Sequence, residues 1–213
     1  MSLEQVRTFV SESIALDKRW EFINVLGGEP TLHPDFQAII AALLHEYVDT
    51  SSPDTVVQIT SNGHGAFVLR QLEQLPAHPR LIVNRDSFKD NERVPYFTPF
   101  NDAPIDDPAF AAADFRKGCW VTSYCGLGLN HLGYFACAVA GGIERLLGAG
   151  RGVRSLAEVD ASIAETLDTY CRLCGNFKHY EQSRGDFVPR SEKDVCDGPV
   201  LSTTWTELYG RHG

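Results

Sequence analysis

The first part of the chain alternates between helix-like and strand-like patterns of apolar residues. In residues 3–18 the apolar side chains recur at intervals of three and four, which is the spacing of one face of a helix. Ser2 and Gln5 form a capping-box pattern at its start,. The same reasoning predicts strands at 21–26, 55–60 and 80–84 and helices at 35–48 and 65–75,. This order of elements, with short connections, predicts an α/β fold of parallel strands with right-handed crossovers.

The second part of the chain has a different pattern. Residues 85–118 show no clear periodicity and contain four prolines, so we expect a boundary there between a βα core over residues 1–100 and a cysteine-rich module with a tail over residues 101–213. Apolar spacing predicts a further helix over 156–170,. The polar tail beyond Tyr180 is expected to be irregular, and Glu144 and Arg145 are expected on a solvated helix face.

Composition excludes several classes of protein. The chain has 213 residues with 43% hydrophobic and 22% charged side chains, as in an ordinary globular protein. A net charge of −9 argues against a broad nucleic-acid-binding face. The sequence has no long apolar stretch and no basic region followed by an apolar core at its start, so we expect no membrane span, no secretory signal and a cytoplasmic location.

The strand at 21–26 ends in a pair of glycines, Gly27 and Gly28, followed by Glu29. Glycines expose the main chain to a ligand, and the C-terminal edge of parallel strands is where α/β folds bind cofactors. Glu29 offers a carboxylate to a cation such as a ligand ammonium. The alternative interpretation is a strand-to-helix turn that simply needs glycine.

Polar residues also follow the next two predicted strands. Ser61 and Asn62 follow the second strand, and Asn84 and Asp86 follow the third. At the same sheet edge their side chains are candidates to bind ribose hydroxyls or a carboxylate. They are equally typical of plain turns.

Six cysteines lie in the second half of the chain, and none precedes Cys119. A reducing compartment disfavours disulfides, so metal ligation and buried free thiols compete. Cys171 and Cys174 have the two-residue gap that lets both thiolates reach one metal. Cys125 and Cys137 flank an expected hairpin whose glycines would wrap an inorganic core. An iron–sulfur cluster therefore fits better than zinc, which stays an alternative.

The remaining candidates for metal ligation are weaker. Cys119, beside Trp120, is either a ligand or a buried thiol. His131 lies within the expected hairpin as a candidate fourth ligand or a polar loop residue, and Cys196 lies far along the polar tail.

The stretch Gly27-Gly28-Glu29-Pro30 resembles the motif with which radical S-adenosylmethionine (SAM) enzymes hold the methionine end of SAM. The resemblance implies a partial (βα) barrel. It also implies a SAM ammonium held by backbone carbonyls near Gly27 and Gly28 and by the Glu29 carboxylate, and a ribose reached by Asn84 or Asp86 with Ser61 nearby.

The cysteine pattern resembles the SPASM or Twitch type of auxiliary module of the same superfamily. It implies one auxiliary [4Fe-4S] cluster bound by Cys137, Cys171 and Cys174 together with Cys125 or Cys119. Such a cluster would relay an electron or anchor a substrate, so the implied partners are a substrate that the sequence does not identify and an electron donor.

One defining feature of the radical SAM superfamily is missing from the sequence. The Cys-x-x-x-Cys-x-x-Cys loop, whose cluster cleaves SAM, would precede residue 1 together with a first strand. We expect an N-terminally shortened form of a radical enzyme, because the SAM-edge residues are intact; a natural remnant is the alternative. The competing function is a non-catalytic iron–sulfur or zinc-stabilised binding module.

Overall fold

The chain divides into two compact units, Met1–Arg93 and Val94–Gly213. The computed structural model describes residues 1–85, 100–179 and 201–212. Asp86 and Cys196 lie outside these ranges. Within them, no helix has both the length and the apolar character needed to cross a bilayer.

The N-terminal unit contains a three-stranded parallel sheet in the order β1-β2-β3. The strands are β1 (Phe22–Val25), β2 (Val56–Thr60) and β3 (Leu81–Asn84), each within a predicted range. The helices are α1 (Leu3–Ala15), α2 (Phe36–Ala41), which continues as a π-helical segment over Ala42–Val48, and α3 (Ala66–Glu73), with a 3₁₀ turn at Pro30–Leu32. The predicted mixed α/β fold with parallel strands is confirmed. Among the described residues this sheet has only three strands, so the expected partial barrel stays a prediction.

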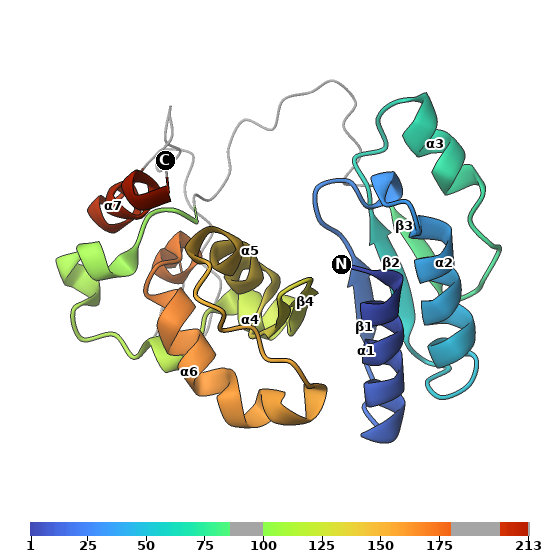
Figure 1. Cartoon of the computed structure of the whole chain (residues 1–213), viewed down its shortest axis with the longest axis horizontal. Helices are drawn as coiled ribbons and strands as arrows, with labels where there is room; N and C mark the ends of the chain where they lie inside the picture. Colours follow the sequence, from blue (N-terminus) through green and yellow to red (C-terminus); the bar gives the residue numbers. More distant parts are fainter. Residues whose placement is uncertain (86–99, 180–200, 213) are drawn as a thin grey trace. The chain divides into compact units, whose positions relative to one another are not determined.

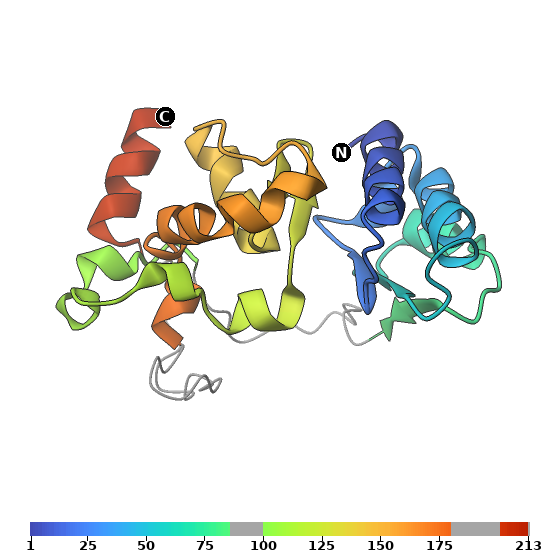
Figure 2. The same ribbon diagram turned by 90° about the horizontal axis from the view of Figure 1, so that it is seen from below.

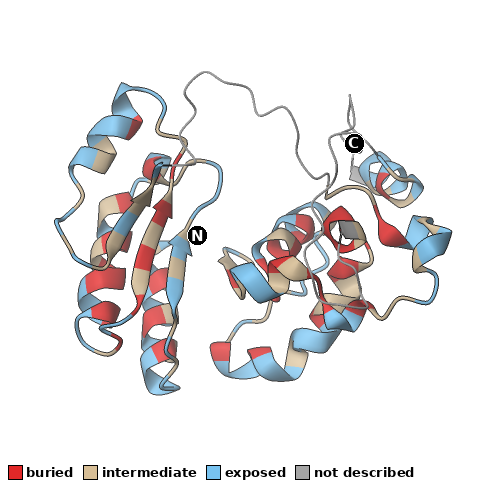
Figure 3. Cartoon of the chain, turned by 180° about the vertical axis from the view of Figure 1, so that it is seen from behind, coloured by how far each residue is buried: buried red, intermediate tan, exposed pale blue. Residues whose placement is uncertain are grey.

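Strand alternation decides which face of this sheet is covered. Ile23, Val57 and Leu81 are register partners and belong to the core formed with α1 and α2. Figures 1 and 3 show these helices on one face of the sheet. On the other face Phe22 and Ile82 are exposed. Within this unit, helices therefore cover one face of the sheet. The parallel register places the C-terminal ends of the three strands at the same edge.

The C-terminal unit is built from short elements around one apolar core. They are α4 (Trp120–Cys125), β4 (Gly128–Asn130), β5 (Gly133–Phe135), α5 (Ala138–Leu147), α6 (Val159–Cys171) and α7 (Thr203–His212), with several 3₁₀ turns between them. Strands β4 and β5 pair as an antiparallel hairpin, as predicted. In Figure 2, α5 (dark yellow) and α6 (orange) are neighbours in this unit. Helix α7 (red) lies beside the green segment that starts at residue 100.

The expectation of an irregular tail is wrong for its last part, because α7 is a helix. Trp205 on α7 is fully buried, and its indole Nε1 donates a hydrogen bond to the carbonyl of Leu173 at 2.6 Å. The Asp106 carboxylate accepts hydrogen bonds from the backbone and hydroxyl of Thr204 at 2.8 and 2.7 Å, so a distant residue caps the helix.

The expectation that Glu144 lies on a solvated face is also wrong. Glu144 on α5 is only 1% exposed, because its carboxylate lies between α5 and α6. There it accepts a hydrogen bond from the Tyr170 hydroxyl at 2.6 Å. Arg145, the next residue, is exposed as expected.

Candidate functional site

The first candidate site is the end of β1, where Gly27 and Gly28 are exposed. A Cβ atom added at either glycine would meet no atom within 4 Å. Gly27 has a positive φ of +157°, which gives glycine a conformational role there. Gly28 has neither a positive φ nor a close neighbour, so the fold itself does not require glycine at this position. Bare main chain is thus open to a ligand at this edge.

The Glu29 carboxylate is engaged by donors of the chain itself. Oε1 accepts from the Thr31 backbone at 3.1 Å and from the Thr31 hydroxyl at 2.7 Å. Oε2 accepts from the Asn62 backbone at 2.7 Å. The Ser61 hydroxyl lies 3.0 and 3.1 Å from the two oxygens. Glu29 therefore links the loop after β1 to the turn after β2 through hydrogen bonds, and both of its carboxylate oxygens accept from donors of the chain itself.

These contacts keep Glu29 ionised. Partial burial raises its pKa, but the hydrogen bonds from Asn62, Thr31 and Ser61 outweigh burial and lower the pKa below the usual 4.5. A carboxyl group whose pKa is lower in the folded chain stabilises the fold above its unfolded pKa, and this contribution is lost as the pH falls through the folded value.

We expect Glu29→Gln to destabilise the N-terminal unit by about 1–3 kcal/mol at pH 7, since charge-assisted hydrogen bonds are lost. The difference from the parent protein should shrink below pH 4.5 as the parent carboxyl is protonated,. Denaturant unfolding as a function of pH measures both effects. Glu73→Gln, which changes an exposed acid on α3, is the control, and equal stability of the two variants would contradict the role of Glu29.

Asn84, Ser61 and Asn62 were also predicted at this edge, and all three lie at or directly after the ends of β2 and β3. Thr60 pairs with Asn84, so the ends of β2 and β3 meet. Asn62 accepts a hydrogen bond from the backbone of His64 at 2.7 Å through its side chain, and Ser61 is buried. The structure therefore brings Glu29, Ser61 and Asn62 into one hydrogen-bonded group.

The second candidate site lies in the core of the C-terminal unit, where four cysteines line one cavity. Cys119, Cys137, Cys171 and Cys174 are each 5–7% exposed, and all four border the same cavity. Burial raises the pKa of Cys171 and Cys174, and the proximity of Cys119 and Cys137 raises it further. The fold thus brings together thiols from the starts of α4 and α5, the end of α6 and the turn after α6.

Three of these cysteines precede helical segments, where backbone N–H groups are free to donate. Cys119 and Cys137 are the N-cap residues of α4 and α5, and Cys137 Sγ accepts from the backbone of Ala140 at 3.4 Å. Cys174 directly precedes a 3₁₀ turn and accepts from the Asn176 side chain at 3.5 Å. Donors aimed at sulfur favour thiolates and metal-bound thiolates.

Burial acts in the opposite direction on the free thiols. It raises the pKa of Cys119, Cys137 and Cys171, and it raises that of Cys174 from 9.0 to about 12. The cysteines are therefore neutral thiols without a metal, and metal binding would release protons.

The remaining metal candidates lie elsewhere. Cys125 and His131 are exposed, and Cys125 does not line the cavity. The hairpin glycines have a packing role: a Cβ at Gly128 would lie 2.7 Å from the backbone of Ala138, and one at Gly133 would lie 2.4 Å from the carbonyl oxygen of Val153. Close packing against neighbouring backbone therefore explains these two glycines without a cluster.

The four thiols are of the residue type that binds structural zinc and iron–sulfur clusters, but their arrangement in the structure is not that of a formed metal site. Within the described ranges, no group of three His, Cys, Asp or Glu side chains is arranged to hold a single metal ion. A cluster separates its thiolates, because each binds a different iron atom. The cavity holds about 10 Å³, roughly the space of one water molecule, so a cluster requires the cysteine side chains to move apart.

No family model, curated protein or solved structure matches the chain. Support for a function therefore comes from the two sites and from the Gly27-Gly28-Glu29-Pro30 stretch.

Proposed function

We propose that the chain is a radical SAM superfamily protein that binds SAM at the β1 edge and an auxiliary [4Fe-4S] cluster at four cysteines. The convergence of Cys119, Cys137, Cys171 and Cys174 on one cavity carries this proposal. The ligands of a SAM-cleaving cluster are not in this sequence, because no cysteine precedes Cys119. The substrate stays unidentified.

At the β1 edge, the proposed SAM site uses exposed main chain and one fixed negative charge. The carbonyls near Gly27 and Gly28 would accept hydrogen bonds from the ligand ammonium. Glu29, which stays ionised, would attract the same group through space and hold the glycine loop against the Ser61–Asn62 turn. Asn84 stands beside Thr60, within the edge where a ribose would lie.

In the C-terminal unit, Cys119 takes the fourth ligand position, because it lines the cavity and Cys125 does not. A cluster there would supply one-electron transfer or a coordination point for a substrate. The chain contributes four thiolates, N–H donors that stabilise sulfur charge, and an apolar wall that limits access of water.

Anaerobic reconstitution with iron and sulfide tests the metal centre. We expect about four iron atoms per chain and the broad visible absorbance of a cluster. Zinc retained at about one ion per chain, with no iron uptake, would refute the cluster.

Gly28→Val tests the SAM site. The variant should fold with unchanged stability, because a side chain there meets no neighbour, and it should weaken SAM binding at least about 10-fold, a loss of about 1.4 kcal/mol. Calorimetric titration with SAM measures the affinity. Gly142→Ala, at an open glycine on α5, is the control. Equal affinity in both variants would refute the site.

A second function is supported by the position of the cysteines inside the main core of their unit. There a metal would act as a structural core, and the protein would be a non-catalytic iron–sulfur or zinc-stabilised binding module. Metal uptake without any SAM binding favours this function over the first.

A further inference from the structure

One face of the parallel sheet is not covered by helices of its own unit. Ile23, Val57 and Leu81 point into the core with α1 and α2, so the side chains at alternating strand positions point to the opposite face. On that face Phe22 is 48% exposed and Ile82 is 45% exposed. Parallel sheets are normally covered on both faces, so a bound molecule is expected on this one.

Two side-chain amides lie next to each other in the middle of the uncovered face. Asn24 on β1 pairs in register with Gln58 on β2, and Gln58 pairs with Ile82 on β3. Neighbouring strands of a sheet are about 4.8 Å apart. Asn24 is exposed and Gln58 is half-buried. Neither amide has a hydrogen-bond partner within residues 1–85, 100–179 and 201–212.

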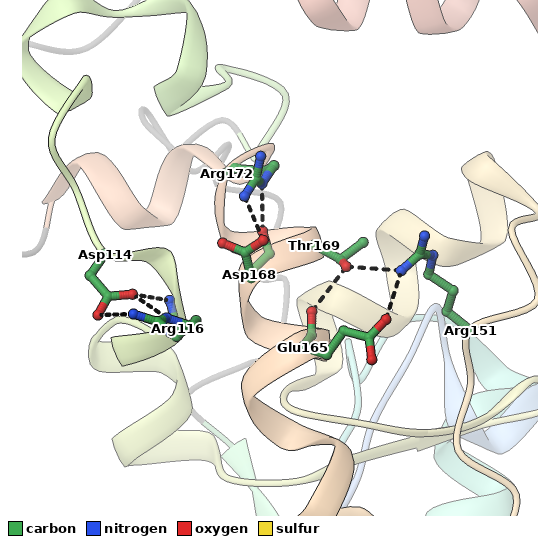
Figure 4. A network of polar contacts seen from close by, with 7 residues as sticks. All are labelled: Asp114, Arg116, Arg151, Glu165, Asp168, Thr169 and Arg172. Atoms are coloured by element: carbon green, nitrogen blue, oxygen red, sulfur yellow. Dashed lines mark hydrogen bonds and ion pairs between the residues drawn. The ribbon is translucent and has the colours of Figure 1, made fainter.

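Polar side chains on other parts of the surface pair with one another. In the C-terminal unit, Arg116 donates to the Asp114 carboxylate, and Arg172 donates to that of Asp168. Figure 4 shows both guanidinium groups directed at their carboxylates. The two amides of the sheet face have no such partner in the part of the chain that the structure describes, so their donors and acceptors are available to an added molecule.

The free amides limit what can cover this face. An apolar surface laid over Asn24 and Gln58 would bury N–H and C=O groups without partners, which costs more than a single hydrogen bond contributes. A molecule that brings its own N–H and C=O groups avoids this cost, because each side-chain amide offers both donors and an acceptor. An amide-bearing occupant is therefore favoured over an apolar helix.

The strands also carry no charge on this face. Apart from the two amides, the strand positions that point to it are Phe22, Val56, Thr60, Ile82 and Asn84. Arg80, directly before β3, already forms an ion pair with Asp54 at 3.0 Å. A charged ligand would lose hydration here without an opposite charge on the strands to replace it, so an uncharged ligand fits better.

We propose that Asn24 and Gln58 bind a small, uncharged molecule through an amide group of that molecule. The N–H of the ligand donates to the carbonyl of one side chain, and its C=O accepts from the NH₂ group of the other. Phe22 and Ile82 contact the apolar part of the ligand.

The amide site lies near the β1 edge. Asn24 precedes Gly27 by three positions in the sequence, which is at most about 10 Å of strand. A molecule held at Asn24 is therefore a neighbour of SAM and its substrate, and this assignment alone rests on the proposed function. Binding of the amide itself requires neither SAM nor a metal.

Nuclear magnetic resonance of the full chain tests the site, because the side-chain NH₂ groups of Asn24 and Gln58 give their own signals. Uracil is the probe with a ring amide, and N-acetylleucinamide is the probe with an open-chain amide. We expect saturable shifts of both NH₂ signals with a dissociation constant of about 1–10 mM, as is usual for ligands of few atoms. Binding of either probe supports the proposal, and the tighter one identifies a ring or an open chain as the source of the amide.

Matched controls separate hydrogen bonding from apolar contact. Uracil methylated at both ring nitrogens keeps its shape but has no N–H donor, so it should bind about 5-fold to 10-fold more weakly than uracil. Gln58→Leu keeps an apolar strand position and should weaken binding of the tighter probe by at least about 10-fold. Asn24→Ala, at an exposed position, should have the same effect. Gln74→Leu, which removes an exposed amide at the end of α3, should bind like the parent protein.

Three results would overturn the amide site. They are the absence of shifts at both NH₂ groups with either probe, equal binding of uracil and its methylated form, and parent-like binding by both Gln58→Leu and Asn24→Ala. Amide binding by a protein that does not bind SAM would support the site and overturn only its assignment to a substrate.

Discussion

Cys171→Ala is expected to abolish assembly of the proposed cluster and to destabilise the C-terminal unit by roughly 4 kcal/mol or more relative to the parent protein reconstituted with iron and sulfide. The cysteine lies in the wall of the cavity with three other thiols. Metal binding is coupled to folding in such sites, so losing a ligand removes binding free energy from the folded state. Iron analysis after anaerobic reconstitution and thermal unfolding of the loaded protein measure the two effects.

Cys125→Ala is the matched control, because this thiol is exposed and outside the cavity. It should bind iron and unfold like the parent. If Cys125→Ala lost the metal and Cys119→Ala kept it, the assignment of the fourth ligand to Cys119 would be wrong.

Trp205→Ala is expected to destabilise the C-terminal unit by about 3–5 kcal/mol, the usual cost of deleting a buried tryptophan. The indole is fully buried, packs edge-on against Phe100 with ring centroids 5.4 Å apart, and donates to the Leu173 carbonyl between two cavity cysteines. Trp205→Phe keeps most of the apolar contact and isolates the hydrogen bond, which should account for about 1 kcal/mol.

Denaturant unfolding of the metal-free protein measures these differences. Tyr209→Ala, on the same helix but 37% exposed, is the control. A cost below about 1 kcal/mol for Trp205→Ala would show that α7 does not hold the turn between Cys171 and Cys174.

The local elements of the N-terminal unit were predictable, because their signals are short in range. Apolar spacing gave the three strands, and the Ser2–Gln5 capping box is present as predicted, with bonds of 3.2 and 3.0 Å. Parallel pairing followed from the alternation of helices and strands. Only the π-helical form of Ala42–Val48 has no signal that we recognise in the sequence.

The features that were missed depend on contacts between distant residues. Helix α7 is capped by Asp106, almost a hundred positions earlier, so its start has no complete local signal. The three-residue spacing of Trp205 and Leu208 was the available hint of a helix. Residue type predicts that Glu144 is exposed to solvent, and only the fold reveals its hydrogen-bond partner, Tyr170.

At the candidate sites, residue types were easier to predict than their contacts. The sequence indicated that Glu29 and Ser61 share a sheet edge, but not that they bond to each other. Spacing indicated that Cys171 and Cys174 belong together, but not that Cys119 joins them instead of Cys125. The choice depends on the direction of α4, which carries one cysteine at each end.

Three helical segments begin directly after Cys119, Cys137 and Cys174, and N–H donors lie near each sulfur. A chelator that strips a metal from these thiols would therefore disturb the first turn of three separate segments at once. Far-ultraviolet circular dichroism during a chelator titration would then report occupancy continuously, without a coloured or paramagnetic centre.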